Sequence, residues 1–141
     1  MAKIRIRIEF DASAEVLRLR EDVFVKGQGV TLQEEHCDDE STFVHFGLYC
    51  DDTLVACCRM KHSGNVATIG RVAVSKEYRN RGFGLAVMDE AHKYAFESGC
   101  VSAEISSQLH AVEFYKKMGY EEYGDQYLDA RILHVSMKKQ L

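Results

Sequence analysis

A short segment of the chain places two arginines and two glycines just ahead of a helical pattern: Arg79-Asn80-Arg81-Gly82-Phe83-Gly84. The first turn of a helix leaves backbone N–H groups unpaired, and the helix dipole adds roughly half a positive charge there. Glycine has no Cβ, so ligand atoms can approach its backbone closely, and arginine keeps its charge at physiological pH. The segment therefore predicts an anion site suited to a pyrophosphate.

Two other phosphate-binding loops do not fit this segment. A Walker A loop needs a lysine followed by Ser or Thr, and a dinucleotide-binding loop needs three spaced glycines with an acidic residue after the next strand. The missing lysine and hydroxyl argue against a regulator that binds ATP. Taken alone, the segment also agrees with a tight turn whose arginines are solvated.

A second motif, AVEFYKKMGY, occupies residues 111–120. The pattern R-V-A-V-x-x-x-Y-R-x-x-G-x-G from residue 71, followed by A-x-x-F-Y-x-K-x-G-Y, resembles the GNAT superfamily of acetyl-CoA-dependent N-acetyltransferases. Residues 23–30, the acidic segment behind them and residues 127–137 resemble, more narrowly, its YjcF/ElaA-like bacterial branch. The chain departs from that branch at Gly27, Thr31, Ser106 and residues 131–134, where an acceptor would sit. The resemblance therefore leaves the acceptor open.

The resemblance implies acetyl-CoA (coenzyme A) as the cofactor. Backbone groups of residues 72–74 would pair with the pantetheine arm, an N–H near Val74 could polarise the thioester carbonyl, and the N–H groups of residues 79–85 would hold the pyrophosphate. The cofactor-binding residues implied in this way are Val72, Ala73, Val74, Arg79, Asn80, Arg81, Gly82, Phe83, Gly84, Leu85, Gln108 and Tyr115.

Acyl transfer to an amine needs a base for the incoming ammonium and an acid for the leaving thiolate. Tyr115 matches the family tyrosine that protonates the thiolate, and a packed core tyrosine is the alternative. His134 lies where some relatives place the base, and an ordinary histidine pKa near 6.5 suits that role. His110, Glu104, a bound water or a merely packed His134 stay open as alternatives.

Residues 34–40, EEHCDDE, combine several groups that could bind a metal, but their spacing matches no metal motif, so we expect a solvated acidic segment and no metal. If it borders the acceptor, its charge would favour a cationic amine. The resulting hypothesis is direct attack by a primary amine on acetyl-CoA in a ternary complex. A catalytically silent acyl-CoA sensor is the alternative, and the acceptor is a small-molecule or protein amine.

Length and composition limit the wider context. A chain of 141 residues indicates one domain, residues 1–141, and a net charge of −4 without a basic run argues against a nucleic-acid partner. We find no signal peptide and no apolar run near 20 residues, so we expect a cytoplasmic protein without a membrane partner. Whether the protein forms a homodimer stays open. Cys57 and Cys58 should point to opposite faces of a strand as reduced thiols.

Hydrophobic periodicity predicts the elements that position these motifs. Ile4, Ile6, Ile8 and Phe10 alternate with charged residues, which indicates a strand with one buried face. A helix capped by Asp11 or Ser13 should end near Gly27, and a polar loop should follow. We expect three hairpin strands at 43–50, 53–61 and 67–74, and a helix from Gly82 to Ser98 that buries Leu85, Val87, Met88, Ala91 and Ala95.

A strand at 101–106, a helix at 108–118 with Phe114 inward, and strands at 121–127 and 132–139 complete the order β-α-loop-β-β-β-α-β-α-β-β. Hairpin runs beside helices indicate the α+β (mixed α/β) class. The family resemblance implies the GNAT fold, a central twisted, mostly antiparallel sheet of about seven strands with helices on both faces.

Overall fold

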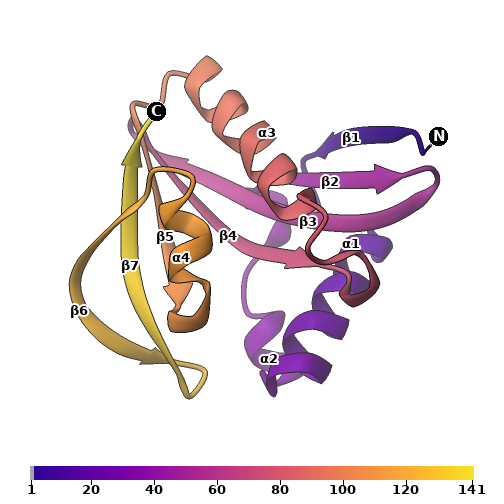
Figure 1. Ribbon diagram of the computed structural model, residues 1–141, viewed down its shortest axis with the longest axis horizontal. Helices are drawn as coiled ribbons and strands as arrows, with labels where there is room; N and C mark the ends of the chain where they lie inside the picture. Colours follow the sequence, from indigo (N-terminus) through magenta and orange to yellow (C-terminus); the bar gives the residue numbers. More distant parts are fainter. Residues whose placement is uncertain (1) are drawn as a thin grey trace.

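The computed structural model describes residues 2–141, and its strands form a single seven-stranded sheet (Figure 1). The sheet order is β1-β2-β3-β4-β5-β7-β6, and every neighbouring pair is antiparallel except β4 and β5. The α+β class, the chain order and the mostly antiparallel sheet are therefore confirmed. The strands are β1 Ile4–Glu9, β2 Val44–Cys50, β3 Thr53–Ser63, β4 Val66–Val74, β5 Ser102–Gln108, β6 Glu121–Asp129 and β7 Ile132–Gln140.

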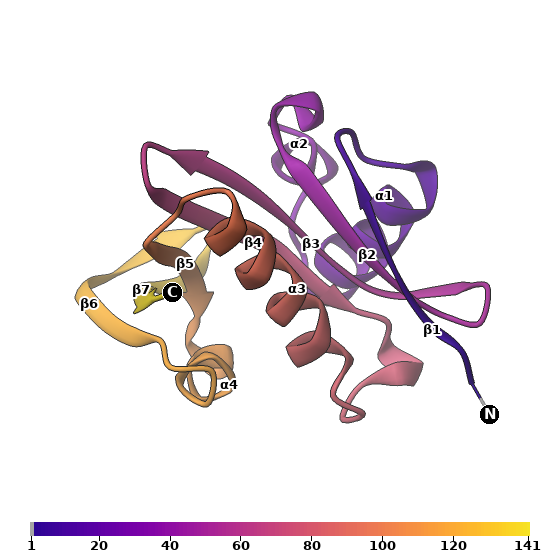
Figure 2. The ribbon, with the colours of Figure 1, turned by 90° about the horizontal axis from the view of Figure 1, so that it is seen from above.

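Helices cover both faces of the sheet, as expected (Figures 1 and 2). The long helix α3 (Phe83–Glu97) and the short α4 (Val112–Lys116) lie on one face, and α1 (Ala14–Arg20) lies on the other. A π-helical turn, Glu21–Lys26, continues α1, and α2 (Leu32–Glu35) follows it. Short 3-10 turns occupy Glu40–Thr42, Lys76–Tyr78 and Leu109–Ala111.

Local signals account for several element ends. The Ser13 hydroxyl accepts a hydrogen bond from the backbone N–H of Val16 at 3.2 Å and so caps α1. Helix α3 ends where Gly99 adopts a φ of +96°, a conformation that glycine reaches without a steric cost. Both ends lie where the sequence predicts them.

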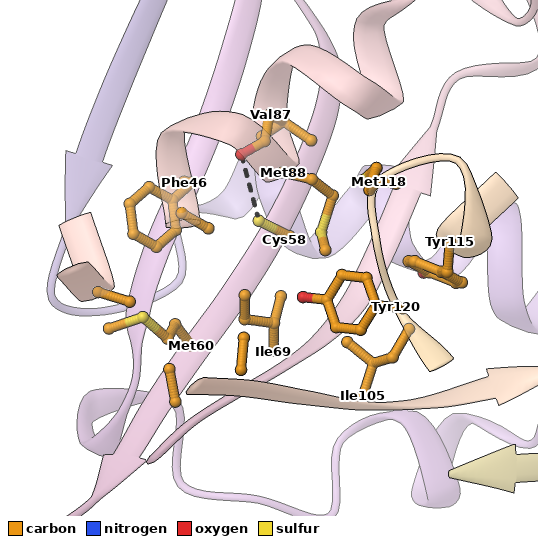
Figure 3. Packing of buried hydrophobic residues seen from close by; sticks show 14 of the residues in the cluster. Phe46, Cys58, Met60, Ile69, Val87, Met88, Ile105, Tyr115, Met118 and Tyr120 are labelled. Atoms are coloured by element: carbon orange, nitrogen blue, oxygen red, sulfur yellow. Dashed lines mark hydrogen bonds between the residues drawn. The ribbon is translucent and has the colours of Figure 1, made fainter. Parts of the chain in front are cut away.

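The main core fills the space between α3, α4 and the sheet (Figure 3). Met60, Ile69 and Met88 are fully buried there, and the Cys58 thiol faces the backbone carbonyl of Val87. A smaller cluster under α1 contains Cys57. The two neighbouring cysteines therefore do point to opposite faces of β3.

An opening in the middle of the sheet separates its two halves. Strands β4 and β5 pair only from Val66–Ser102 to Thr68–Glu104, although β4 runs on to Val74 and β5 to Gln108. Beyond Thr68 the two strands diverge, as Figure 1 shows. One edge of β4 therefore has no strand partner along its second half.

Some predicted positions are wrong. Ile4 is 50% exposed and Ile8 39% exposed, because β1 is an edge strand and α3 packs mainly over β2, β3 and β4. Leu85 is 45% exposed, since it lies two residues, about 200° of helix, before the buried Val87. The helix expected at 108–118 is shorter, because Gln108 ends β5 and a 3-10 turn precedes α4. Phe114 is partly exposed rather than inward.

Candidate active site

A cavity of about 430 Å³ lies where β4 and β5 diverge. Residues 68–72 of β4 and 105–108 of β5 line two of its sides. Residues from the segment between 24 and 38 form a third wall, and the turn between β6 and β7 forms a fourth. The opening in the sheet is thus a bounded site that four distant parts of the chain surround.

Tyr115 lines this cavity from α4, packed edge-on against Phe114 and Tyr120. Its side chain is buried, and burial raises the pKa of Tyr115 well above the ordinary tyrosine value. The phenol is therefore protonated at neutral pH and can act as a proton donor. Figure 3 shows Tyr115 on the Tyr120 side of the core.

His134 lines the same cavity from β7, opposite Gln108 of β5. Its Nδ1 lies 2.7 Å from the carbonyl oxygen of Ile132, and because a carbonyl only accepts, Nδ1 carries the proton of this bond. The ring stacks on Tyr127, with 6.0 Å between ring centroids. In the neutral ring, Nε2 is left with a lone pair that can accept a proton.

The rival bases differ in position. His110 also lines the cavity, and its Nε2 lies 2.6 Å from Oε1 of Gln108. Glu104 does not line the cavity; it lies on β5 in register with Thr68 and Lys138. The structure therefore brings Tyr115, His134 and His110 to one site, and it leaves Glu104 outside.

The predicted anion loop leads into α3. Gly82 adopts a φ of +82° ahead of the first helical turn, no side chain caps the helix, and its first turn contains no acidic residue. Arg79 donates from Nε to the carbonyl oxygen of Val74 at 3.2 Å, and the Arg81 guanidinium lies over the Tyr78 ring. An uncapped helix start beside two arginines fits a pyrophosphate.

Gly84 has a second role that the sequence does not reveal. A Cβ at this position would lie 3.1 Å from Phe114 and 3.3 Å from Val74. The missing side chain therefore allows α3 to pack closely against both β4 and α4. This packing requires glycine at residue 84 independently of the close approach of a ligand.

A β-bulge interrupts β4 beside the cavity. Two residues, Arg71 and Val72, lie opposite the single residue Cys58 of β3, and Arg71 has a φ of +50°. A bulge leaves part of the strand outside the regular ladder and reorients its backbone groups. Of the three strand residues predicted to bind the cofactor, Val72 lines the cavity, whereas Ala73 is buried toward α1.

A buried ion network lies against the cavity from the α1 side. Oε1 of Glu35 accepts hydrogen bonds from Nε of Arg20 at 2.7 Å and from Nε of Arg71 at 3.0 Å. Glu40 binds Arg20 and Arg59. Burial alone would raise the pKa of Glu40, but the hydrogen bonds from the two arginines outweigh it and lower this pKa to about 2.

Two of the remaining carboxylates of the acidic segment are paired with arginines as well, whereas Asp39 is exposed and accepts hydrogen bonds from Ser41. Asp38 accepts from Nη2 of Arg59 at 2.6 Å, and Glu34 binds Arg131 through both carboxylate oxygens. The expectation of a solvated acidic segment holds for residues 36–39, which are exposed. It is wrong for Glu35, which is buried, and for Glu34 and Glu40, which are partly buried and bound to arginines. The charge of the segment gives no support to a cationic acceptor. Within residues 2–141, no group of three or more His, Cys, Asp and Glu side chains is arranged to hold a metal ion.

The positions of two residues at the cavity could not be predicted from the sequence. Gln28 reaches the site through a 2.6 Å hydrogen bond from Nε2 of Gln108 to its Oε1, across 80 residues of chain. Arg71 is the first residue of the recognised R-V-A-V motif, yet its place in the ion network has no local signal.

No helix of the described residues has the length and apolar character to span a membrane.

Comparisons with known proteins agree with this geometry. Residues 11–120 match the model of the Acetyltransferase (GNAT) family. The uncharacterized N-acetyltransferase YjcF of Bacillus subtilis strain 168 is 34% identical over 122 residues, which cover 86% of this chain and 87% of YjcF.

Two solved structures resemble the whole chain. A protein from Lactobacillus plantarum, assigned as an N-acetyltransferase, superimposes with a TM-score of 0.89 at 28% identity and 98% coverage of both chains. Escherichia coli ElaA superimposes with a TM-score of 0.83 at 24% identity and 99% coverage of both chains, a likeness of fold. The chain is therefore an acyltransferase of the GNAT family, in its YjcF/ElaA-like bacterial branch.

Proposed function

We propose that this enzyme transfers the acetyl group of acetyl-CoA to the primary amine of an acceptor, by direct attack in a ternary complex. One observation carries the proposal: Tyr115, a proton donor, and His134, a proton acceptor, line one cavity at the opening of the sheet. Transfer of an acyl group to an ammonium needs both roles.

The cofactor would lie along the opening between β4 and β5. Acetyl-CoA, when bound, supplies the acetyl group as a thioester. The free edge of β4 beyond Thr68 can pair with an amide-bearing arm as it would with another strand, which supports roles for Val72 to Val74. The N–H groups of residues 79–85 would bind the pyrophosphate at the start of α3, and Gln108 would contribute from β5.

The two side chains would move protons at opposite ends of the reaction. His134 accepts a proton from the acceptor ammonium at Nε2, which frees the nitrogen lone pair for attack on the acetyl carbonyl carbon. As the new C–N bond forms and the C–S bond breaks, Tyr115 donates its phenolic proton to the sulfur. The nitrogen loses its second proton as it becomes an amide, and this proton restores the phenol of Tyr115 through solvent. A backbone N–H near Val74 would stabilise the negative charge on the carbonyl oxygen.

Replacing Tyr115 by Phe tests the proton donor. We expect kcat, followed as release of free CoA with an amine panel, to fall by about 10²- to 10⁴-fold. Calorimetric affinity for acetyl-CoA should change little. Tyr123→Phe, an exposed tyrosine outside the cavity, is the matched control. Full activity of the Tyr115 variant would remove the tyrosine from the mechanism.

His134→Gln tests the base. We expect the acidic limb of the pH–rate profile to disappear, whereas His110→Gln should leave that limb in place. The reverse result would assign the base to His110. Tight binding of acetyl-CoA by the unmodified enzyme without turnover of any amine would instead favour the silent acyl-CoA sensor.

A further inference from the structure

The turn that joins β6 and β7 contains two non-glycine residues with positive φ, Ala130 at 48° and Arg131 at 67°. Two-residue hairpin turns with two positive φ angles strongly prefer Asn-Gly or Gly-Gly, because a Cβ makes this backbone unfavourable. Such a conformation persists only where the surrounding structure holds it. The next question is which contacts hold this turn.

Arg131 is fixed by three hydrogen bonds to the opposite side of the cavity. Its Nη1 and Nη2 bind the two carboxylate oxygens of Glu34 at 3.2 and 3.0 Å, and Nη2 also binds the carbonyl oxygen of Gly29 at 3.1 Å. Glu34 is itself oriented by the capping box of α2, since its Oε1 accepts from the backbone N–H of Thr31 at 2.9 Å. We call these contacts the Arg131 bridge.

The Arg131 bridge connects two walls of the cavity. Its neighbours Asp129, Ala130 and Ile132 line the site from the turn, and Val30 and Glu34 line it from the other side. Together with the hydrogen bond between Gln28 and Gln108, the bridge joins residues 28–34 to the β5–β7 half of the sheet at two points. These two contacts join opposite walls of the cavity, which stays partly open to solvent.

The volume of the cavity between these walls limits the size of the acceptor. The cavity has a volume of about 430 Å³. If the proposed function holds, the acetyl-bearing end of the cofactor occupies part of this space. A polypeptide acceptor would have to place its extended backbone between residues 28–34 and the β6–β7 turn, and the Arg131 bridge joins these two walls.

We propose that the acceptor is a small free amine, and that the Arg131 bridge excludes amines carried by polypeptides. This inference rests on the proposed function, because it concerns the acceptor of the same reaction. Arg131 is a specificity-determining residue in this account and takes no part in the proton transfers.

The test compares two acceptor sets by kcat/KM: small primary amines, and short peptides with a free N-terminal amine or a lysine. Arg131→Gly removes the bridge and places glycine at a position where the turn prefers it, so the variant should fold. Ala130→Gly changes the same turn and keeps the bridge, which makes it the matched control.

We expect the unmodified enzyme to use small amines and to use peptides poorly. Arg131→Gly should raise kcat/KM for peptides relative to small amines by about fivefold, the factor that fits loss of an exposed bidentate pair. Ala130→Gly should leave the ratio unchanged. Peptide turnover equal to that of small amines in the unmodified enzyme, or an unchanged ratio in Arg131→Gly, overturns the inference while the proposed function stands. Absence of turnover with every acceptor overturns both.

Discussion

Replacing Glu35 by Gln tests the buried ion network beside the cavity. The side chains of Arg20 and Glu35 are each only 1% exposed, and their nitrogen and oxygen atoms approach to 2.6 Å. Glu35 also binds Arg71, so one carboxylate serves two arginines. The substitution keeps the shape of the side chain, removes its charge and leaves Arg20 and Arg71 with one negative charge fewer.

The expected cost follows from burial. Removing one partner of a buried ion pair costs about 3–5 kcal/mol, because the other charge is left uncompensated away from water. Arg20 keeps a 2.8 Å contact with Glu40, and a Gln oxygen can still accept from Nε, which places the cost near the lower end, about 3 kcal/mol. With a urea m-value of about 1.5 kcal/mol/M, the unfolding midpoint should fall by about 2 M.

Glu34→Gln provides the matched control at the neighbouring position. Its partner Arg131 is 62% exposed, and solvent screens an exposed pair, so the midpoint should fall much less than in Glu35→Gln. The measurement is urea unfolding of both variants followed by circular dichroism, with unchanged m-values. Equal midpoint shifts for the two variants would refute the reasoning that burial sets the cost.

Two further perturbations test the packing and a buried histidine. Gly84→Ala should lose about 1 kcal/mol net in urea unfolding, because overpacking against Phe114 and Val74 at about 1–3 kcal/mol outweighs the gain in helix propensity. The double variant Gly84→Ala with Phe114→Leu should recover most of the lost stability. If it recovers none, the close contact between residue 84 and Phe114 is not the cause of the loss. Burial, with a smaller effect of Lys139, lowers the pKa of His92 to about 4, so between pH 6.5 and 4 the native state binds fewer protons than the unfolded chain and stability falls as pH falls. The thermal midpoint of the unmodified protein should drop more steeply across this pH window than that of the His92→Gln variant. If the two plots of midpoint against pH are parallel, His92 is not the source of the pH dependence.

Local patterns predict much of this fold. The hairpin from residue 43 to 74, the cap at Ser13 and the helix end at Gly99 depend on residues close together in the chain, so short windows contain the necessary information. The opposite orientation of Cys57 and Cys58 follows from the period of a strand. The family motifs identify Tyr115 and the anion loop in the same way.

Burial at the edge of the sheet could not be predicted. Ile4 and Ile8 alternate as a buried face should, yet no helix covers that edge. The acidic residues 34–40 are similarly misleading, because their arginine partners come from four elements that are distant in sequence. A charge pattern does not show whether a carboxylate meets water or a guanidinium.

The sequence by itself determined the order of the elements, the fold class and the family, because periodicity, caps and motif spacing are properties of short segments. Only the tertiary structure decided that β4 and β5 diverge after Thr68, that Tyr115 and His134 line one cavity, and that Arg131 joins two of its walls. The physical reason is that these features depend on contacts between segments up to 102 residues apart, where packing and charge pairing act together.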